Sequence, residues 1–200
     1  VNTDLLDVYK EWIKENPFDI GHGWATEPWC QKEMVPSEDI VSEARKKSDT
    51  AVIVIGRTAG EDRDNSEEKG SWYLTDEEEA LFDVVSHHFE NTVAVLNVGN
   101  IIDMNWVDKY NIKSVLYVWQ GGQEGGNAVA DVLSGDVNPS GRLSDTIAYH
   151  ISDYPAYNSF GGKLFNIYQE DIYVGYRYFE TFAKERVMYP FGFGLSYTNF

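Results

Sequence analysis

The sequence predicts an α/β fold in which helices cover both faces of a mostly parallel sheet. Three apolar runs, at residues 51–55, 92–98 and 114–119, are rich in β-branched side chains and indicate buried strands. Each run precedes a segment whose apolar residues recur at helical spacing. Strands that alternate with helices are typical of βαβ units, whose strands lie parallel in one sheet. The run at 51–55 is apolar throughout, so we expect this strand to be buried on both faces.

The helices are predicted from apolar spacing together with capping residues. An amphipathic helix opens the chain and is expected to end before Pro17. Ser37 is placed to cap a short helix that runs to about residue 47. Thr75 and Glu78 form a capping-box pattern at the start of a third helix. Two further helices are predicted, one around residues 101–109 and one that reaches residue 133, where Gly135 is placed to end it.

This regular pattern occupies only part of the chain. Residues 17–36 are rich in Gly, Pro and Trp and predict an irregular loop, and a turn at 138–141 precedes short strands and wrapping loops. We therefore predict lead-in helices and an irregular aromatic-rich segment at 1–49, followed by an α/β domain at 50–200. The chain does not begin with methionine, and we expect it to be a fragment of a larger multidomain protein.

The composition excludes several classes of partner. With 33 acidic and 16 basic residues the net charge is −17, which disfavours nucleic acid and anionic membranes as partners. No apolar run approaches the ~18 residues of a membrane span. The single cysteine fits a reducing compartment, so we expect a cytoplasmic protein. The four histidines show no spacing typical of a metal site, and we predict neither a metal nor a cofactor.

The segments that follow the predicted strands are the candidate site. Because parallel strands end at the same edge of a sheet, these three polar loops are expected to meet there, where ligands of open α/β sheets bind. Such an edge suits a polyhydroxylated ligand, although the same side chains could serve only to cap the following helices. The first loop is harder to explain by capping, since it carries three carboxylates. The loop residues are Glu61, Arg63 and Asp64, then Asn97, Asn100 and Asp103, then Gln120, Gln123 and Glu124.

Two kinds of chemistry are conceivable at this edge. A nucleotide site is disfavoured, because neither glycine-rich loop matches a phosphate-binding fingerprint and both contain acidic residues that would repel a pyrophosphate. A carboxylic acid beside a binding crevice can instead act as the general acid in glycoside hydrolysis. That reaction needs a second carboxylate, for which no other loop is convincing. The residues alone therefore indicate half of an active site.

Five motifs in order resemble the second domain of glycoside hydrolase family 3 enzymes, chiefly the β-glucosidases. The similarity spans about residues 50–200, and the first 45 residues match less distinctively. The motifs are GRTAGEDRD at 56–64, VWQGGQEGG at 118–126, NPSGRL at 138–143, YVGYRY at 173–178 and YPFGFGLSY at 189–197.

The resemblance implies a three-layer α/β/α sandwich with a six-stranded sheet, packed against a TIM-barrel domain that precedes or follows it. It also implies a retaining β-glycosidase that hydrolyses terminal β-D-glucosyl residues of a β-glucoside or short oligosaccharide. In such enzymes the nucleophile is an aspartate of the barrel, and the acid/base is a glutamate of this domain, which corresponds to Glu61. The isolated chain is accordingly expected to be inactive. The alternative is a non-catalytic carbohydrate-binding or interdomain module.

The first motif departs from the family pattern at two positions. Asp62 stands where a glycine is usual, and it would raise the pKa of Glu61 if both side chains faced the crevice, or would have no effect if it pointed to solvent. Asn65 stands where an arginine is common, and Arg63 either compensates for it or pairs with Asp64. We assign Arg63, Asp64 and Trp72 to substrate binding, with core or interface packing as the alternative for Trp72. Glu170 and Arg177 are expected to be buried, paired structural residues.

Overall fold

The computed structural model describes residues 2–58 and 64–198, which fall into two compact units. The first unit comprises Val1–Asn100 with Trp106–Gly121, and the second comprises Ile101–Asn105 with Gly122–Phe200. Each unit has its own sheet.

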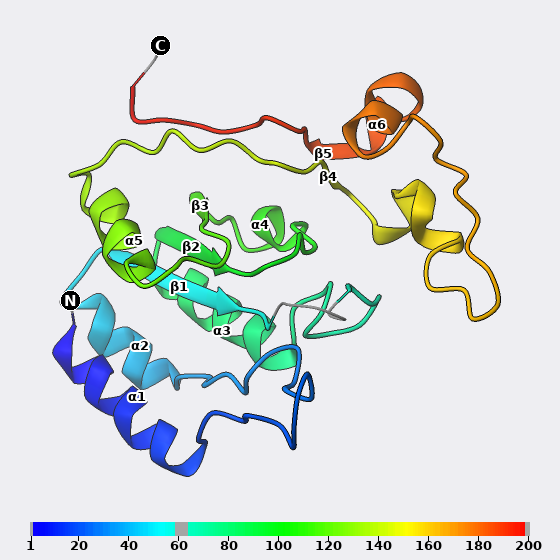
Figure 1. Cartoon of the computed structure of the whole chain (residues 1–200). Helices are drawn as coiled ribbons and strands as arrows, with labels where there is room; N and C mark the ends of the chain where they lie inside the picture. The colour runs from blue at the N-terminus through cyan, green and yellow to red at the C-terminus, as the bar shows by residue number, and fades with distance from the viewer. Residues whose placement is uncertain (1, 59–63, 199–200) are drawn as a thin grey trace. The chain divides into compact units, whose positions relative to one another are not determined.

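The first unit is built on a parallel sheet of three strands in the order β1-β2-β3 (Figure 1). The strands are β1 (Thr50–Gly56), β2 (Asn91–Asn97) and β3 (Ser114–Tyr117). In register, Gly56 of β1 lies opposite Asn97 of β2, and Leu96 lies opposite Tyr117 of β3. All three strands therefore end at one edge, as the sequence predicted for parallel strands.

The first three helices of the unit each begin at a capping residue, and two of these residues, Ser37 and Thr75, were predicted. Asn2 caps α1 (Thr3–Glu15), which ends before Pro17 as expected. Ser37 caps α2 (Glu38–Arg45) by accepting a hydrogen bond from the Ile40 amide. Thr75 and Glu78 form the predicted capping box of α3 (Asp76–His88). The helix α4 (Trp106–Lys109) is much shorter than the segment predicted for it.

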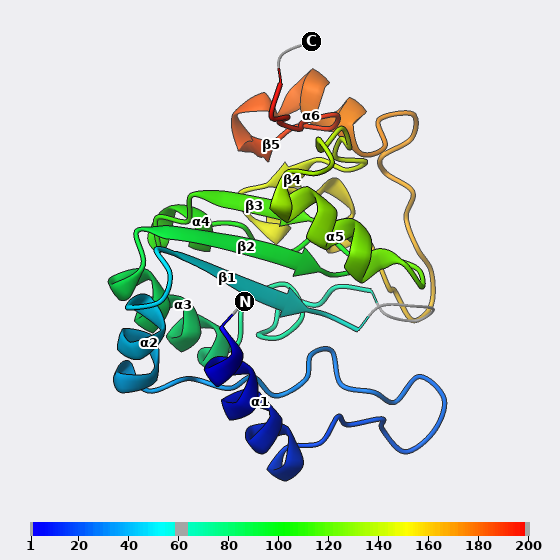
Figure 2. The ribbon, with the colours of Figure 1, turned by 90° about the vertical axis from the view of Figure 1, so that its left-hand side faces the viewer.

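One face of the sheet is covered by α3, which contacts β1 and β2, with α2 packed beside it (Figure 2). Part of the core is an aromatic cluster. Phe82 of α3 is fully buried and stacks on Trp106 and Tyr110, with ring centroids 4.7 and 5.7 Å away. On β1, the buried side chains are Ile53 and Ile55.

The prediction that β1 is buried on both faces is wrong for this structure. Val52 and Val54, which point away from Ile53 and Ile55, are 48% and 55% exposed. A strand buried on one face alone usually alternates apolar and polar residues, but here both faces are apolar. The uncovered face of β1 is thus an apolar surface.

The second unit has less regular structure, as expected for the last quarter of the chain. It contains α5 (Gly125–Ser134), which ends at Gly135 with φ 84°, as predicted. Two short strands, β4 (Ile147–Ala148) and β5 (Val187–Tyr189), pair in an antiparallel sheet. The core joins Ala148 to Phe179 and Ala183. The other elements are η1 (Ile151–Asp153), η2 (Pro155–Asn158), α6 (Tyr176–Phe182) and η3 (Lys184–Arg186).

The α/β class is therefore confirmed, but the six-stranded sheet is not. Among the described residues the strands form one parallel sheet of three and a separate antiparallel pair. Within this same part of the chain, no helix combines the length and apolar character needed to cross a membrane.

Candidate functional site

The candidate site begins at the edge where β1 and β2 end. The Arg57 amide donates to the Asn97 carbonyl over 3.1 Å, which extends the strand pairing into the first loop. Beyond it, Asn100 Nδ2 donates to Asn65 Oδ1 over 3.4 Å. The Tyr117 hydroxyl of β3 donates to the Asn100 carbonyl over 2.8 Å. The first two strand-end loops therefore meet at one edge, as predicted.

The third loop is divided between the two units. Gln120 belongs to the first unit and is exposed. Gln123 and Glu124 belong to the second unit, as does Asp103 from the second loop. There the Glu124 carboxylate accepts a hydrogen bond from Asn127 Nδ2, and Asp103 accepts one from Asn105 Nδ2, each over 2.5 Å. These acids are engaged by neighbouring amides in their own unit.

The structure describes only two of the four residues that the sequence analysis assigned to catalysis or substrate binding, Asp64 and Trp72. Glu61 and Arg63, with Asp62 between them, lie outside the described residues. Asp64 is described and exposed. Trp72 is only 1% exposed, so its side chain is part of the core. Its assignment to substrate binding stays a prediction, and its burial favours the packing role given as the alternative.

An unpredicted residue, Arg57, organises the base of the first loop. Its guanidinium and the Glu78 carboxylate form a bidentate ion pair, in which the Nη1–Oε1 distance is 2.5 Å and the Nη2–Oε2 distance is 2.7 Å. Arg57 is 7% exposed and Glu78 is 3% exposed. Burying two charges is expensive unless their geometry is good and their remaining hydrogen bonds are made. The sequence held a signal for this pair: an arginine directly after a buried strand, and a carboxylate in a capping box.

The remaining donors of Arg57 bind backbone carbonyls at both ends of the loop. Nη1 donates to the Gly56 carbonyl over 2.8 Å, at the end of β1. Nη2 and Nε donate to Tyr73 and Ser71 carbonyls over 3.3 and 3.4 Å, where the chain returns toward α3. Glu78 Oε2 also accepts from the Thr75 amide over 2.8 Å. Since Thr75 and Glu78 cap α3, the carboxylates of Glu61 and Asp64 are not needed for that purpose.

Gly70 lies where the returning arm of the loop passes Cys30. Its φ is +81°, and a Cβ placed on it would lie 2.7 Å from Cys30 Sγ. Burial raises the pKa of the Cys30 thiol, with the nearby Glu78 adding to the rise and Arg57 opposing it. The close approach at Gly70 therefore requires a residue without a side chain.

We expect Gly70→Ala to lower the free energy of unfolding by about 1–2 kcal/mol from the left-handed backbone alone, with the contact to Cys30 adding to it. Urea unfolding of the purified chain measures this change. The double variant Cys30→Ala/Gly70→Ala, compared with Cys30→Ala, removes the contact and leaves the backbone effect. An unchanged unfolding midpoint in Gly70→Ala would contradict the conformation described here.

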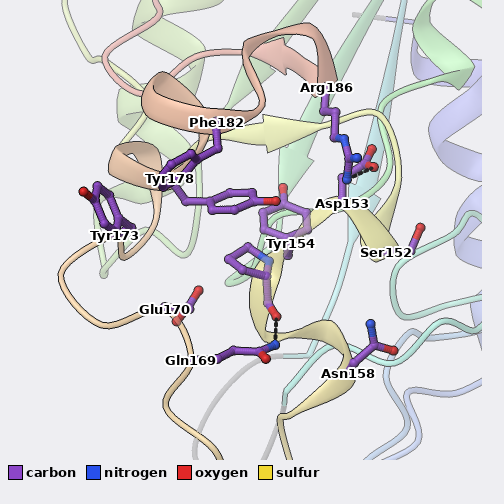
Figure 3. Close-up of a pocket in the computed structure, with 11 residues that line it drawn as sticks. Ser152, Asp153, Tyr154, Asn158, Gln169, Glu170, Tyr173, Tyr178, Phe182 and Arg186 are labelled. Atoms are coloured by element: carbon purple, nitrogen blue, oxygen red, sulfur yellow. Dashed lines mark hydrogen bonds and ion pairs between the residues drawn. The ribbon is translucent and has the colours of Figure 1, made fainter.

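The second unit contains a cavity of about 520 Å³ (Figure 3). An ion pair between Asp153 and Arg186, 3.5 Å apart, lies at one end, and Gln169 and Glu170 lie at the other. The Tyr154 hydroxyl donates to the Thr146 carbonyl and accepts from the Ala148 amide, and burial raises the pKa of this tyrosine strongly. These contacts hold the second unit together, and we assign the cavity no part in the chemistry.

Two sequence expectations fail in this unit. Glu170 is half-buried at the cavity wall rather than fully buried. Arg177 is exposed, with its guanidinium carbon 5.6 Å from the centre of the Tyr176 ring. A long arginine side chain can lie on an aromatic face while its charge stays in water, so the apolar neighbours of Arg177 in the sequence do not require its burial.

Comparison with known proteins decides the family. The family model described as "Glycosyl hydrolase family 3 C-terminal domain" matches residues 5–197. The chain belongs to glycosyl hydrolase family 3. This C-terminal domain is 54% identical over 200 residues to the β-glucosidase of Ruminococcus albus, covering 100% of the chain and 21% of that protein. It is 43% identical to β-glucosidase A of Butyrivibrio fibrisolvens, covering 86% of the chain and 24% of that protein.

Solved structures agree with this family 3 assignment. The chain superposes on a β-glucosidase from Paenibacillus barengoltzii with a TM-score of 0.96 at 54% identity, covering all of this chain and 22% of that one. It superposes on β-glucosidase 3B from Thermotoga neapolitana in complex with glucose with a TM-score of 0.87 at 36% identity, covering 99% and 29%. The family 3 domain thus spans between a fifth and a third of these relatives.

Proposed function

We propose that this chain is part of a retaining β-glucosidase in which Glu61 is the general acid/base and the nucleophile is a carboxylate of a TIM-barrel domain. The observation that carries the proposal is the place of Glu61 in the chain. It lies in the connection that begins at the carboxyl end of β1, where ligands of α/β sheets bind. The names of the relatives support a glucoside as the substrate, and the structure of one of them was solved in complex with glucose.

The proposed reaction has two steps. Glu61, as a carboxylic acid, donates its proton to the glycosidic oxygen while the barrel carboxylate attacks the anomeric carbon and the glycosidic bond breaks. Glu61, now a carboxylate, then takes a proton from water, whose oxygen bonds to the anomeric carbon and releases the nucleophile. Retention requires the two carboxyl groups to stand about 5–5.5 Å apart. Arg63 and Asp64 are proposed to bind sugar hydroxyls beside Glu61.

The finer features of the fold belong to the same proposal. The apolar, exposed face of β1 suits a second layer of helices, as in a three-layer sandwich. Further strands would complete a six-stranded sheet, with the domain boundary near residue 50.

The test is Glu61→Ala in the full-length enzyme, assayed with two aryl β-glucosides. For a poor leaving group, which needs protonation, we expect kcat/KM to fall by about 10²–10⁴-fold. From a dinitrophenyl glucoside the dinitrophenolate departs without protonation. The first step, in which the enzyme is glycosylated, should therefore survive in part with this substrate. Azide attacks the glycosyl-enzyme without a general base, so it should accelerate turnover of this second substrate and yield β-glucosyl azide.

Glu68→Ala is the matched control, because Glu68 is an exposed carboxylate of the same loop whose side chain accepts a hydrogen bond only from nearby Ser66 in the described part of the chain. It should leave both substrates almost unaffected. If Glu61→Ala behaved like Glu68→Ala, the acid/base assignment would be wrong, and a non-catalytic role for this domain would be favoured.

A further inference from the structure

The buried ion pair of Arg57 and Glu78 lies at the base of the loop that carries Glu61, between the end of β1 and the start of α3. One guanidinium binds the Gly56 carbonyl where the loop leaves β1, and the Ser71 and Tyr73 carbonyls where it returns. The same group binds the carboxylate that caps α3. The outgoing arm, the returning arm and the first turn of the helix therefore share a single anchor.

Stability alone does not account for such an anchor. Both charges are removed from water, and replacing a buried ion pair by apolar residues of similar volume is often neutral or stabilising. An apolar pair makes no directional hydrogen bonds, so it cannot hold three carbonyl groups and the start of a helix in one fixed arrangement. The planar fork of arginine supplies that arrangement, whereas lysine, with one ammonium group, cannot.

We propose that Arg57 and Glu78 are positioning residues for acid/base catalysis, which fix the base of the loop that carries Glu61 where it leaves β1 and where it returns toward α3. The inference rests on the proposed role of Glu61. Proton transfer in the transition state demands close alignment, and a displacement of about 1 Å can lower a rate about 100-fold. Loosening the anchor should therefore weaken protonation of the leaving group and spare the steps that do not need it.

The test uses the full-length enzyme and the ratio of kcat/KM for the dinitrophenyl glucoside to kcat/KM for the poor-leaving-group glucoside. Both values come from one preparation, so a variant that is merely less folded lowers both and leaves the ratio unchanged. For Arg57→Lys and Glu78→Gln we expect the ratio to rise about 10- to 100-fold. Glu61→Ala, measured alongside, sets the upper limit of the rise.

A matched control is Glu79→Gln, one residue along α3. Glu79 pairs with Lys109 over 2.8 Å at the surface, so its loss removes an ion pair of the same helix without touching the anchor. Its ratio should equal that of the wild type. The double variant Arg57→Met/Glu78→Leu fills the same space without charge, and it keeps the test valid if the single variants fold poorly. It should fold, and its ratio should rise as in Arg57→Lys.

The outcomes separate the two proposals. A raised ratio in the Arg57 and Glu78 variants, with none in Glu79→Gln, supports the positioning role. If Glu61→Ala raises the ratio while folded Arg57→Lys and the double variant do not, the positioning role is overturned and the function stands. If Glu61→Ala itself leaves the ratio unchanged, the acid/base assignment fails, and the positioning role falls with it.

Discussion

Arg57→Ala is expected to lower the free energy of unfolding by about 3–5 kcal/mol, because it leaves the Glu78 carboxylate buried without its cation. The Gly56, Ser71 and Tyr73 carbonyls also lose a donor. Urea unfolding measures the loss. An unchanged m value, the slope of the unfolding free energy against urea concentration, would show that the variant unfolds from an equally compact state. Exposed ion pairs contribute little by comparison, typically below about 1 kcal/mol.

The double variant Arg57→Met/Glu78→Leu should recover most of this loss, since it removes both charges together. The single variants Arg57→Met and Glu78→Leu complete a double-mutant cycle with this pair, in which we expect strong coupling between positions 57 and 78. Glu79→Gln again provides the control, with a change below about 1 kcal/mol. If Arg57→Ala unfolded at the same urea concentration as the wild type, the pair would not be buried and joined as the structure describes.

Features set by neighbouring residues were predictable from the sequence. The capping box of Thr75 and Glu78, the N-cap at Ser37 and the left-handed turn at Gly135 depend on a few adjacent positions, and all three are present. The three parallel strands were predictable for the same reason. The helix α6 was missed, because its aromatic sequence has modest helix propensity and its first residue follows Gly175 without a side-chain cap.

Features that depend on distant parts of the chain were not predictable in this way. The apolar run of β1 is the same whether its second face is covered or, as for Val52 and Val54, exposed. At the site, parallel strands were enough to predict that the loops of Asn65 and Asn100 meet. The partner of Arg57, however, lies 21 residues away, and only the packing of α3 on β1 brings Glu78 to it.

The isolated 200-residue chain is expected to show no glucosidase activity, although it carries Glu61. A retaining reaction needs a nucleophile and an acid/base on opposite sides of the bond that breaks. We assign only the second of these to this domain. Without a nucleophile there is no glycosyl-enzyme, so even the dinitrophenyl glucoside, which needs no acid, should remain intact apart from its spontaneous hydrolysis.

Two measurements make this prediction decisive. Release of dinitrophenol by the purified, folded chain is compared with release by its Glu61→Ala variant, because a contaminating glucosidase would be unaffected by the substitution. Activity that disappears in the variant would place both catalytic carboxylates in this chain and contradict the division of the site. Calorimetric titration with glucose is the second measurement. A half-site provides only part of the contacts to a sugar, so we expect no measurable binding, whereas clear binding without turnover would favour a carbohydrate-binding module.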